Sequence, residues 1–198
     1  MVKALRLKLP LSEKEIRSLK AGDIIYLSGS IVTARDAAHR RMINHIKMKR
    51  LLPISLKGSA IYHCGPIMRR INGRWAVISA GPTTSMRMEP FESEIIKELG
   101  VRLIIGKGGM GLKTTRAMKN YGAVYGAFTG GAGVLAARFI KRVLDVKWLD
   151  LGMPEAMWTF LVEDFGPLVV AIDSHGNNLY NEVQVRARRI MDNLLERC

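Results

Sequence analysis

Two consecutive segments in the middle of the chain share one pattern, and this pattern constrains the fold more than any other feature. Each segment reads as a short apolar strand, a glycine-rich turn and then a helix. The strands are Val101–Ile105 and Ala123–Ala127, the turns are Gly106–Gly111 and Gly130–Gly133, and the helices end near Asn120 and Val143. Strands that alternate with helices lie parallel, because each helix carries the chain back along the sheet. The middle of the chain therefore predicts an α/β fold whose sheet is at least partly parallel.

The flanking segments are richer in strands than in helices. Further strands are predicted over Leu5–Leu9, Ile24–Val32, Ala60–Cys64, Trp75–Ser79, Val146–Leu151, Trp158–Glu163 and Leu168–Ile172. Helices are predicted after the capping box of Ser12 and Glu15, from Arg35 to about Lys49, from Phe91 to Leu99, and from about Asn178 to the end. No linker interrupts this series, so residues 1–198 are predicted to form one domain.

Cysteine usage and hydropathy indicate the compartment. The chain has two cysteines, Cys64 and Cys198, which form neither a disulfide framework nor a zinc pattern. The N-terminus lacks the features of a signal peptide, and no apolar run is long enough to cross a membrane. A cytoplasmic protein is expected.

The chain is strongly basic, with 31 Lys and Arg against 17 Asp and Glu and a net charge of +14. Nucleic acid, an acidic partner subunit and an anionic substrate would each account for such an excess. Aromatic residues make up only 7%, which disfavours stacking on single strands. Charge alone leaves the three explanations open.

The turn Gly106–Gly111 matches the G-x-G-x-x-G spacing of dinucleotide-binding loops. The following strand, Ala123–Ala127, carries no acidic residue at its end to hold a ribose, so a dinucleotide is disfavoured. A glycine turn at a helix N-terminus still suits a carboxylate or a phosphate, and Lys107 adds a full positive charge there. The alternative is that the glycines only allow a tight turn.

Two other loops combine polar side chains with arginine. Thr83, Thr84 and Ser85 follow a predicted strand end and precede Arg87, whose guanidinium can grip a carboxylate through two parallel hydrogen bonds. The alternative for these hydroxyls is helix capping.

Arg35 is predicted in the first turn of a helix, where a cation opposes the helix dipole. An anion bound at the same helix end would explain this placement, and His39 shares the face one turn on. The alternative is a surface pair between Arg35 and Asp36. The histidine spacing does not predict a metal site, because His39 and His45 lie on different faces and His63 lacks a second ligand pair nearby.

Four sequence blocks together resemble the beta region of the iron–sulfur class of fumarate hydratases and tartrate dehydratases. They are T-x-R-D-A-A-H at Thr33–His39, I-Y-H-C-G-P at Ile61–Pro66, G-P-T-T-S-x-R-M at Gly81–Met88 and I-I-G-K-G-G-M-G at Ile104–Gly111. The resemblance extends from about Gly22 to Asp173. It implies an α/β fold of the swivelling β/β/α type, with a mixed sheet and flanking helices, which closes over a cluster held by a separate alpha region.

The resemblance also implies an activity and a set of roles. It implies a beta subunit that hydrates fumarate to (S)-malate in an α2β2 complex, with a [4Fe-4S] cluster bound by three cysteines of the alpha subunit. The alternative is the beta subunit of L(+)-tartrate dehydratase, and a basic nucleic-acid-binding module is a weaker third interpretation. Thr83 would accept the carbon-bound proton, and Thr84 remains an alternative for this role. The resemblance assigns substrate binding to Arg35, Thr84, Arg87 and Lys107 and leaves the role of His39 open.

Overall fold

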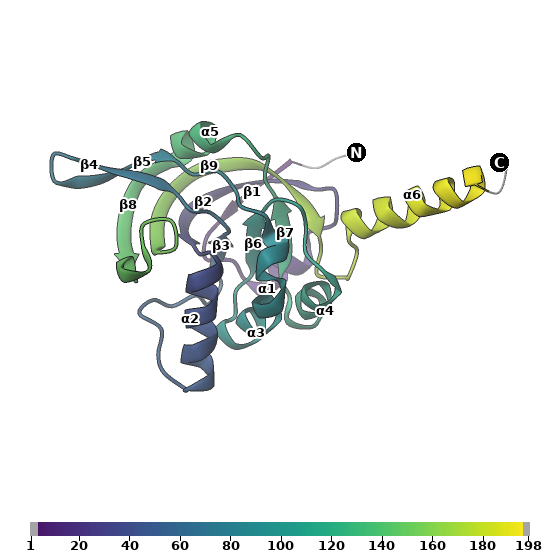
Figure 1. The fold of residues 1–198 in the computed structure, drawn as a ribbon, viewed down its shortest axis with the longest axis horizontal. Coiled ribbons are helices and arrows are strands. Elements are labelled where there is room, and N and C mark those ends of the chain that lie inside the picture. The colour runs from purple at the N-terminus through teal and green to yellow at the C-terminus, as the bar shows by residue number, and fades with distance from the viewer. Residues whose placement is uncertain (1–3, 196–198) are drawn as a thin grey trace.

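The computed structural model describes residues 4–195, and its centre is a mixed sheet (Figure 1). The strands lie in the order β1-β2-β3-β6-β7-β9-β8. Their bounds are β1 (Ala4–Lys8), β2 (Ile24–Thr33), β3 (Ala60–Tyr62), β6 (Leu103–Gly106), β7 (Val124–Ala127), β9 (Met157–Ile172) and β8 (Ile140–Lys147). Neighbours from β1 to β7 are parallel, whereas β9 runs antiparallel to β7, β8 and β2. The predicted α/β class is confirmed.

The long strand β9 closes the sheet on itself. Val169 pairs with Ile24 of β2 on one side and with Ala127 of β7 on the other. The strands β2, β3, β6, β7 and β9 therefore form a closed ring of hydrogen-bonded neighbours. This ring has an inner face and an outer face, and both must be covered by apolar contacts.

The core consists of two apolar clusters, one on each face of these strands. Tyr62 belongs to the inner cluster, together with Leu27 and Phe165, whereas its neighbour Ile61 belongs to the outer one. Alternate residues of a strand point to opposite faces, so the near-continuous apolar composition of the parallel strands follows from burial on both sides.

Three helices cover the outer face, and Figure 1 shows them side by side below the strands. They are α2 (Asp36–Lys47), α3 (Glu89–Leu99) and α4 (Leu112–Tyr121). The helix α3 has Pro90 in its first turn and ends at Gly100, which adopts the left-handed conformation with φ 65°. The short helix α5 (Gly133–Phe139) lies on the opposite side of the sheet.

The remaining elements lie at the periphery. The predicted capping box is present at α1 (Glu13–Arg17), and β4 (Ile67–Ile71) pairs with β5 (Arg74–Ser79) in a hairpin that projects from the body (Figure 1). Two short 3-10 turns are η1 (Ser85–Met88), which precedes α3, and η2 (Leu149–Leu151), which lies between β8 and β9. The helix α6 (Leu179–Leu195) extends away from the body and buries none of its residues. Within residues 4–195, no helix has both the length and the apolar character needed to cross a membrane.

Three sequence-based predictions of secondary structure are wrong. The helix expected to reach Val143 ends at Phe139, and Ile140–Lys147 is strand β8. The strand expected over Val146–Leu151 is the end of β8 followed by η2. The two strands expected over Trp158–Glu163 and Leu168–Ile172 are one strand, β9, with register shifts opposite Leu27. These errors share one cause, because β8 is a strand through its pairing with β9, and β9 is continuous through its pairing with β2, β7 and β8, which local patterns do not show.

Candidate functional site

Loops from four parallel strands converge at one edge of the sheet. Arg35 follows β2, His63 follows β3, Lys107 follows β6 and Phe128 follows β7. These strands are parallel and adjacent, so their carboxyl ends lie together. The carboxyl ends of parallel strands are the usual ligand-binding side of α/β folds, in open sheets and in closed barrels alike.

The loop that carries the predicted hydroxyls is inserted between two of these strand ends. The Thr83 amide donates to the His63 carbonyl at 2.7 Å, and the Lys107 amide donates to the Thr83 carbonyl at 3.3 Å. The Ser85 amide donates to the Lys107 carbonyl at 2.9 Å, and Thr84 forms a parallel bridge with Lys107. Thr83, Thr84 and Lys107, which the sequence assigned to one site, are therefore brought together. Thr83 is half-buried, whereas Thr84 is exposed.

The Lys107 side chain lies over the second glycine turn. A Cβ atom added to Gly130 would lie 3.4 Å from Lys107 Cδ and 3.8 Å from Nζ. Lys107 is half-buried and forms no ion pair within residues 4–195. Its charge is thus available to an anion at the edge where Thr83 and Thr84 lie.

The surface pair between Arg35 and Asp36 that the sequence offered is replaced by two other pairs. Arg87 pairs with Asp36, and Arg35 pairs with Glu155. Arg87 donates two hydrogen bonds to Asp36, from Nε to Oδ1 at 3.1 Å and from Nη2 to Oδ2 at 2.7 Å. The prediction that Arg35 lies in the first helical turn is wrong, because α2 begins one residue later, at Asp36, and Arg35 is its N-cap residue. Arg35 Nε is 3.4 Å from Glu155 Oε1. The Arg35 guanidinium lies directly against the backbone of Gly65, where a Cβ atom would overlap it. The first turn of α2 therefore holds Asp36, whose negative charge suits the helix dipole. Through its contact with Asp36, Arg87 joins the start of α2 to the loop Thr83–Arg87, called the T-T-S-x-R loop.

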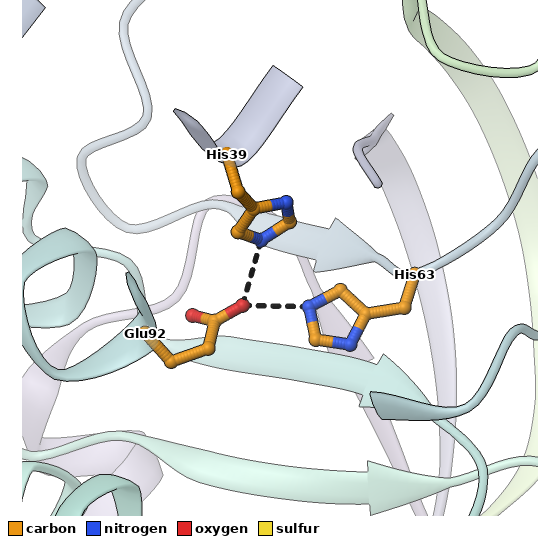
Figure 2. A group of neighbouring side chains, drawn as sticks. All are labelled: His39, His63 and Glu92. Carbon is orange, nitrogen blue, oxygen red and sulfur yellow. Dashed lines mark hydrogen bonds and ion pairs between the residues drawn. The ribbon is translucent and has the colours of Figure 1, made fainter. Parts of the chain in front are cut away.

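Beneath this edge lies a buried polar cluster that the sequence did not predict (Figure 2). His39 of α2, His63 after β3 and Glu92 of α3 are all 0% exposed. Glu92 Oε1 lies 2.8 Å from His39 Nε2 and 2.6 Å from His63 Nε2. The imidazole centroids are 5.1 Å apart, in an edge-on arrangement.

The outer nitrogens of the two imidazoles connect this cluster to the loops that carry Arg35 and Ser85. His39 Nδ1 is 2.7 Å from the Arg35 carbonyl, and His63 Nδ1 is 2.9 Å from Ser85 Oγ. The Tyr125 hydroxyl lies 2.9 Å from the same Ser85 oxygen. A continuous series of hydrogen bonds thus joins the Arg35 loop, the T-T-S-x-R loop and strand β7.

The electrostatics of the cluster follow from burial and pairing. Burial favours the neutral form of Glu92, but the His39 charge and the hydrogen bonds from both imidazoles outweigh it and hold the pKa of Glu92 well below its usual range. Burial lowers the pKa of His63, and the contact with Glu92 only partly opposes this. Within residues 4–195 the one cysteine is Cys64, and burial raises the pKa of its thiol.

The ligand atoms of His39, His63 and Glu92 all lie within 4.8 Å of one another, a spacing that also suits a metal ion. Reasoning from local spacing missed the group because its members come from three separate elements. One signal was present in the sequence: Glu92 lies on the same helical face as Ile95 and Ile96, so its carboxylate faces the core. A carboxylate on a buried face needs a partner.

The fold is of the α/β class, and Thr83, Thr84 and Lys107 lie together at the carboxyl edge of its parallel strands. A family model described as "Fumarase C-terminus" matches residues 1–183. The chain therefore belongs to the fumarase C-terminus family, which confirms the resemblance seen in the four sequence blocks.

Three named relatives match about nine-tenths of this chain. The L(+)-tartrate dehydratase subunit beta of Escherichia coli (strain K12) is 47% identical over 176 residues, 89% of this chain and 86% of that protein. A Methanocaldococcus jannaschii protein, provisionally named as the same subunit, is 47% identical over 186 residues, 93% of this chain and 95% of that protein. A Geobacillus stearothermophilus protein, provisionally named as a class I fumarate hydratase, is 45% identical over 183 residues. That match covers 92% of this chain but 34% of the longer protein, so the chain corresponds to one region of it.

Proposed function

We propose that this chain is the beta subunit of a hydro-lyase that reversibly adds water to fumarate to give (S)-malate, and that it acts only with a cluster-bearing alpha subunit. The observation that carries the proposal is the insertion of the G-P-T-T loop between the ends of β3 and β6. This insertion brings Thr83 and Thr84 beside Lys107. Membership of the family and the names of the relatives support the reaction class.

The charges suit a dicarboxylate. The loops at the carboxyl ends of the parallel strands carry three cations, Lys107, Arg35 and Arg87. Fumarate and malate each carry two carboxylates. Holding both carboxylates fixes the reacting carbons relative to the catalytic groups and so removes much of the entropic barrier. Thr84, exposed and bridged to Lys107, is assigned to contact the substrate.

Thr83 is the better of the two threonines for the proton-accepting role. Its amide and its carbonyl are both held by hydrogen bonds, to His63 and Lys107, so the backbone that carries its side chain is fixed at both peptide groups. In the dehydration direction its oxygen takes the proton from the carbon next to the hydroxyl-bearing one. The electrons of that C–H bond form the double bond as hydroxide leaves. A threonine hydroxyl is a weak base, and the nearby cations favour its deprotonated form.

The [4Fe-4S] cluster belongs to the alpha subunit in this proposal and supplies the Lewis acid for the departing hydroxyl. Cys64 is unsuited to ligate it, since the thiol is buried and its pKa is raised. The alpha partner is proposed on the beta-subunit names of the relatives. The α2β2 assembly is proposed on the resemblance of the four sequence blocks to the family.

Tartrate dehydration to oxaloacetate is the second candidate. It is favoured by the names of two relatives that are 47% identical to this chain. The two substrates present the same pair of carboxylates, so Arg35, Arg87 and Lys107 suit either.

The experiment is anaerobic co-expression with the candidate alpha subunit, followed by cluster reconstitution and assays with fumarate, malate and L(+)-tartrate. Turnover by the mixture and by neither subunit alone supports the proposal, and the better substrate decides between the two activities. A stable complex with an intact cluster that turns over none of the three acids contradicts it.

Arg87 provides the matched pair of variants for this assay. We expect Arg87→Ala to lower kcat/KM by about a hundredfold, because it removes both the bidentate contact to Asp36 and a substrate cation. Arg87→Lys keeps the charge and should lose less. Near-normal kcat/KM in Arg87→Ala would remove Arg87 from the site.

A further inference from the structure

The buried cluster of His39, Glu92 and His63 has no part in the proposed reaction as described so far. We infer that it is a positioning device: a buried cross-link, centred on an imidazolium–carboxylate pair, that sets the Arg35 loop and the T-T-S-x-R loop relative to each other. The functional part of this inference rests on the proposed function, whereas the protonation pattern stands without it.

The first step is the protonation of His39. The Arg35 carbonyl can only accept a hydrogen bond, so the proton of the 2.7 Å contact is on His39 Nδ1. Ionised Glu92 can also only accept, so the 2.8 Å contact requires a proton on His39 Nε2. With both ring nitrogens protonated, His39 is an imidazolium, and its charge is balanced by the Glu92 carboxylate in a place that water does not reach.

The second step is the state of His63. Its Nε2 donates to the same Glu92 oxygen at 2.6 Å. A second imidazolium would leave a net positive charge fully buried, so His63 is neutral and its Nδ1 accepts a hydrogen bond. The donor is the Ser85 hydroxyl at 2.9 Å, and Ser85 in turn accepts from the Tyr125 hydroxyl. Each hydrogen bond in this series therefore has a defined direction.

The third step is the consequence for the site. One end of the series holds the carbonyl of Arg35, and the other end holds Ser85, between Thr84 and Arg87. Both loops are thus tied from below to a core that includes Ile95 and Ile96 of α3. The three residues have no exposed surface, so they act through the loops and touch no substrate.

A metal ion fits the contacts less well. Zinc bonds to histidine nitrogen and carboxylate oxygen are about 2.0–2.2 Å, which would hold the ligand atoms roughly 3.3 Å apart in a tetrahedral site. The observed separations from Glu92 Oε1 are 2.8 and 2.6 Å, as expected for charge-assisted hydrogen bonds. Glu92 Oε2 is buried without a hydrogen-bond partner within residues 4–195, so metal uptake remains an outcome to be tested directly.

The functional test uses two isosteric replacements of one residue. In His39→Asn the amide nitrogen takes the place of Nδ1 and keeps the donor to Arg35, but the contact with Glu92 is lost. In His39→Gln the amide reaches Glu92, but the donor to Arg35 is lost. Glu92→Gln keeps the shape of the side chain and removes the carboxylate charge.

We expect His39→Gln and Glu92→Gln to raise KM by about tenfold and to lower kcat in the reconstituted complex. His39→Gln loses the donor to the Arg35 carbonyl, and Glu92→Gln loses the carboxylate charge that holds His39 as an imidazolium. His39→Asn should raise KM less than His39→Gln. The control is Ile43→Ala, which removes core packing from the same helix and leaves every hydrogen bond of the cluster intact. It should lower the unfolding temperature with KM within about twofold of wild type. Wild-type KM and kcat in folded His39→Gln and Glu92→Gln would overturn the positioning role.

The protonation pattern is tested on the wild-type chain, alone or with its alpha subunit, by incorporating 15N-histidine and recording ring nitrogen resonances near pH 7. We expect His39 to show two protonated nitrogens and His63 one, at Nε2. This measurement gives an answer even if the variants fail to fold or the wild-type complex turns over no acid, so failure of the proposed function is distinguishable. A neutral His39 would overturn the inference. So would uptake of one equivalent of Zn²⁺ with loss of the ring N–H signals.

Discussion

Arg35 shows how a single residue can depend on the absence of a side chain elsewhere. Its guanidinium lies against Gly65, and the neighbouring Pro154 leaves little further space. The glycine of the I-Y-H-C-G-P block is therefore explained by close packing against a cation of the site. A left-handed backbone conformation is not the reason, because Gly65 is absent from the glycines with positive φ.

Replacing this glycine should affect the site more than the fold. We expect Gly65→Ala to raise KM for the dicarboxylate several-fold, because the new methyl group displaces the end of Arg35. The flexible side chain can move, so the unfolding temperature should change by only about 2–4 °C. Steady-state kinetics and thermal unfolding of the same preparation check both parts. An unchanged KM would mean that Arg35 contacts no substrate.

The buried cluster also makes stability depend on pH. His63 has a lowered pKa in the folded state, so the unfolded chain binds its proton first as pH falls below about 6.5. Glu92 also has a lowered pKa, so the unfolded chain takes up that proton first below about 4.5. Both shifts have the same sign, and acidification should destabilise the fold.

Urea unfolding at pH 5.5, 5 and 4, where the histidines of the unfolded chain are protonated, tests this sign. We expect the free energy of unfolding to fall steadily with pH in the wild type, and to fall less steeply in His63→Gln, which keeps a donor near Glu92 but does not titrate. Parallel pH profiles for the two proteins would contradict the assignment to His63.

At the scale of elements, local signals predicted those that local interactions stabilise. The capping box at α1 is an example: the Glu15 amide donates to Ser12 Oγ at 3.2 Å, and the Ser12 amide donates to Glu15 Oε2 at 2.8 Å. Both partners lie within one turn, so the motif was visible in the sequence. By contrast, Ile140–Lys147 follows an alanine-containing helix without a break, and only pairing with β9 makes it a strand.

The cap gives a prediction for one element alone. Ser12→Ala should lower the free energy of unfolding by about 1 kcal/mol, since it removes the acceptor for the Glu15 amide at the start of α1. Activity should be unchanged, because α1 is not one of the segments at the carboxyl ends of the parallel strands, where Arg35, Thr83 and Lys107 lie. Chemical denaturation measures the first effect, and a loss of activity without a loss of stability would contradict the reasoning.

At the scale of the whole molecule, the body and α6 are distinct. The two apolar clusters hold the sheet and the helices α2, α3 and α4 together, whereas α6 packs against the outer cluster only through its first two residues, Leu179 and Tyr180, and has no fully buried residue. The family model also ends within this helix, at residue 183. Truncation after Val185 should therefore leave the unfolding temperature of the body within about 2 °C of the full chain. A larger drop in calorimetry would show that α6 supports the body.

The sequence by itself determined the α/β class, the parallel strands, the loop residues Arg35, Thr83, Thr84, Arg87 and Lys107, and the family. Apolar periodicity, glycine turns and short motifs are local in the chain, so they can be read without coordinates. Whether those five residues share the proposed roles remains a prediction.

The tertiary structure alone decided the closure of the ring by β9, the conversion of Ile140–Lys147 to a strand and the pairing of Arg87 with Asp36. It also decided the meeting of His39, His63 and Glu92. These features join residues that are far apart along the chain. Their free energy comes from burial and from hydrogen bonds in a water-free interior, which no local pattern encodes.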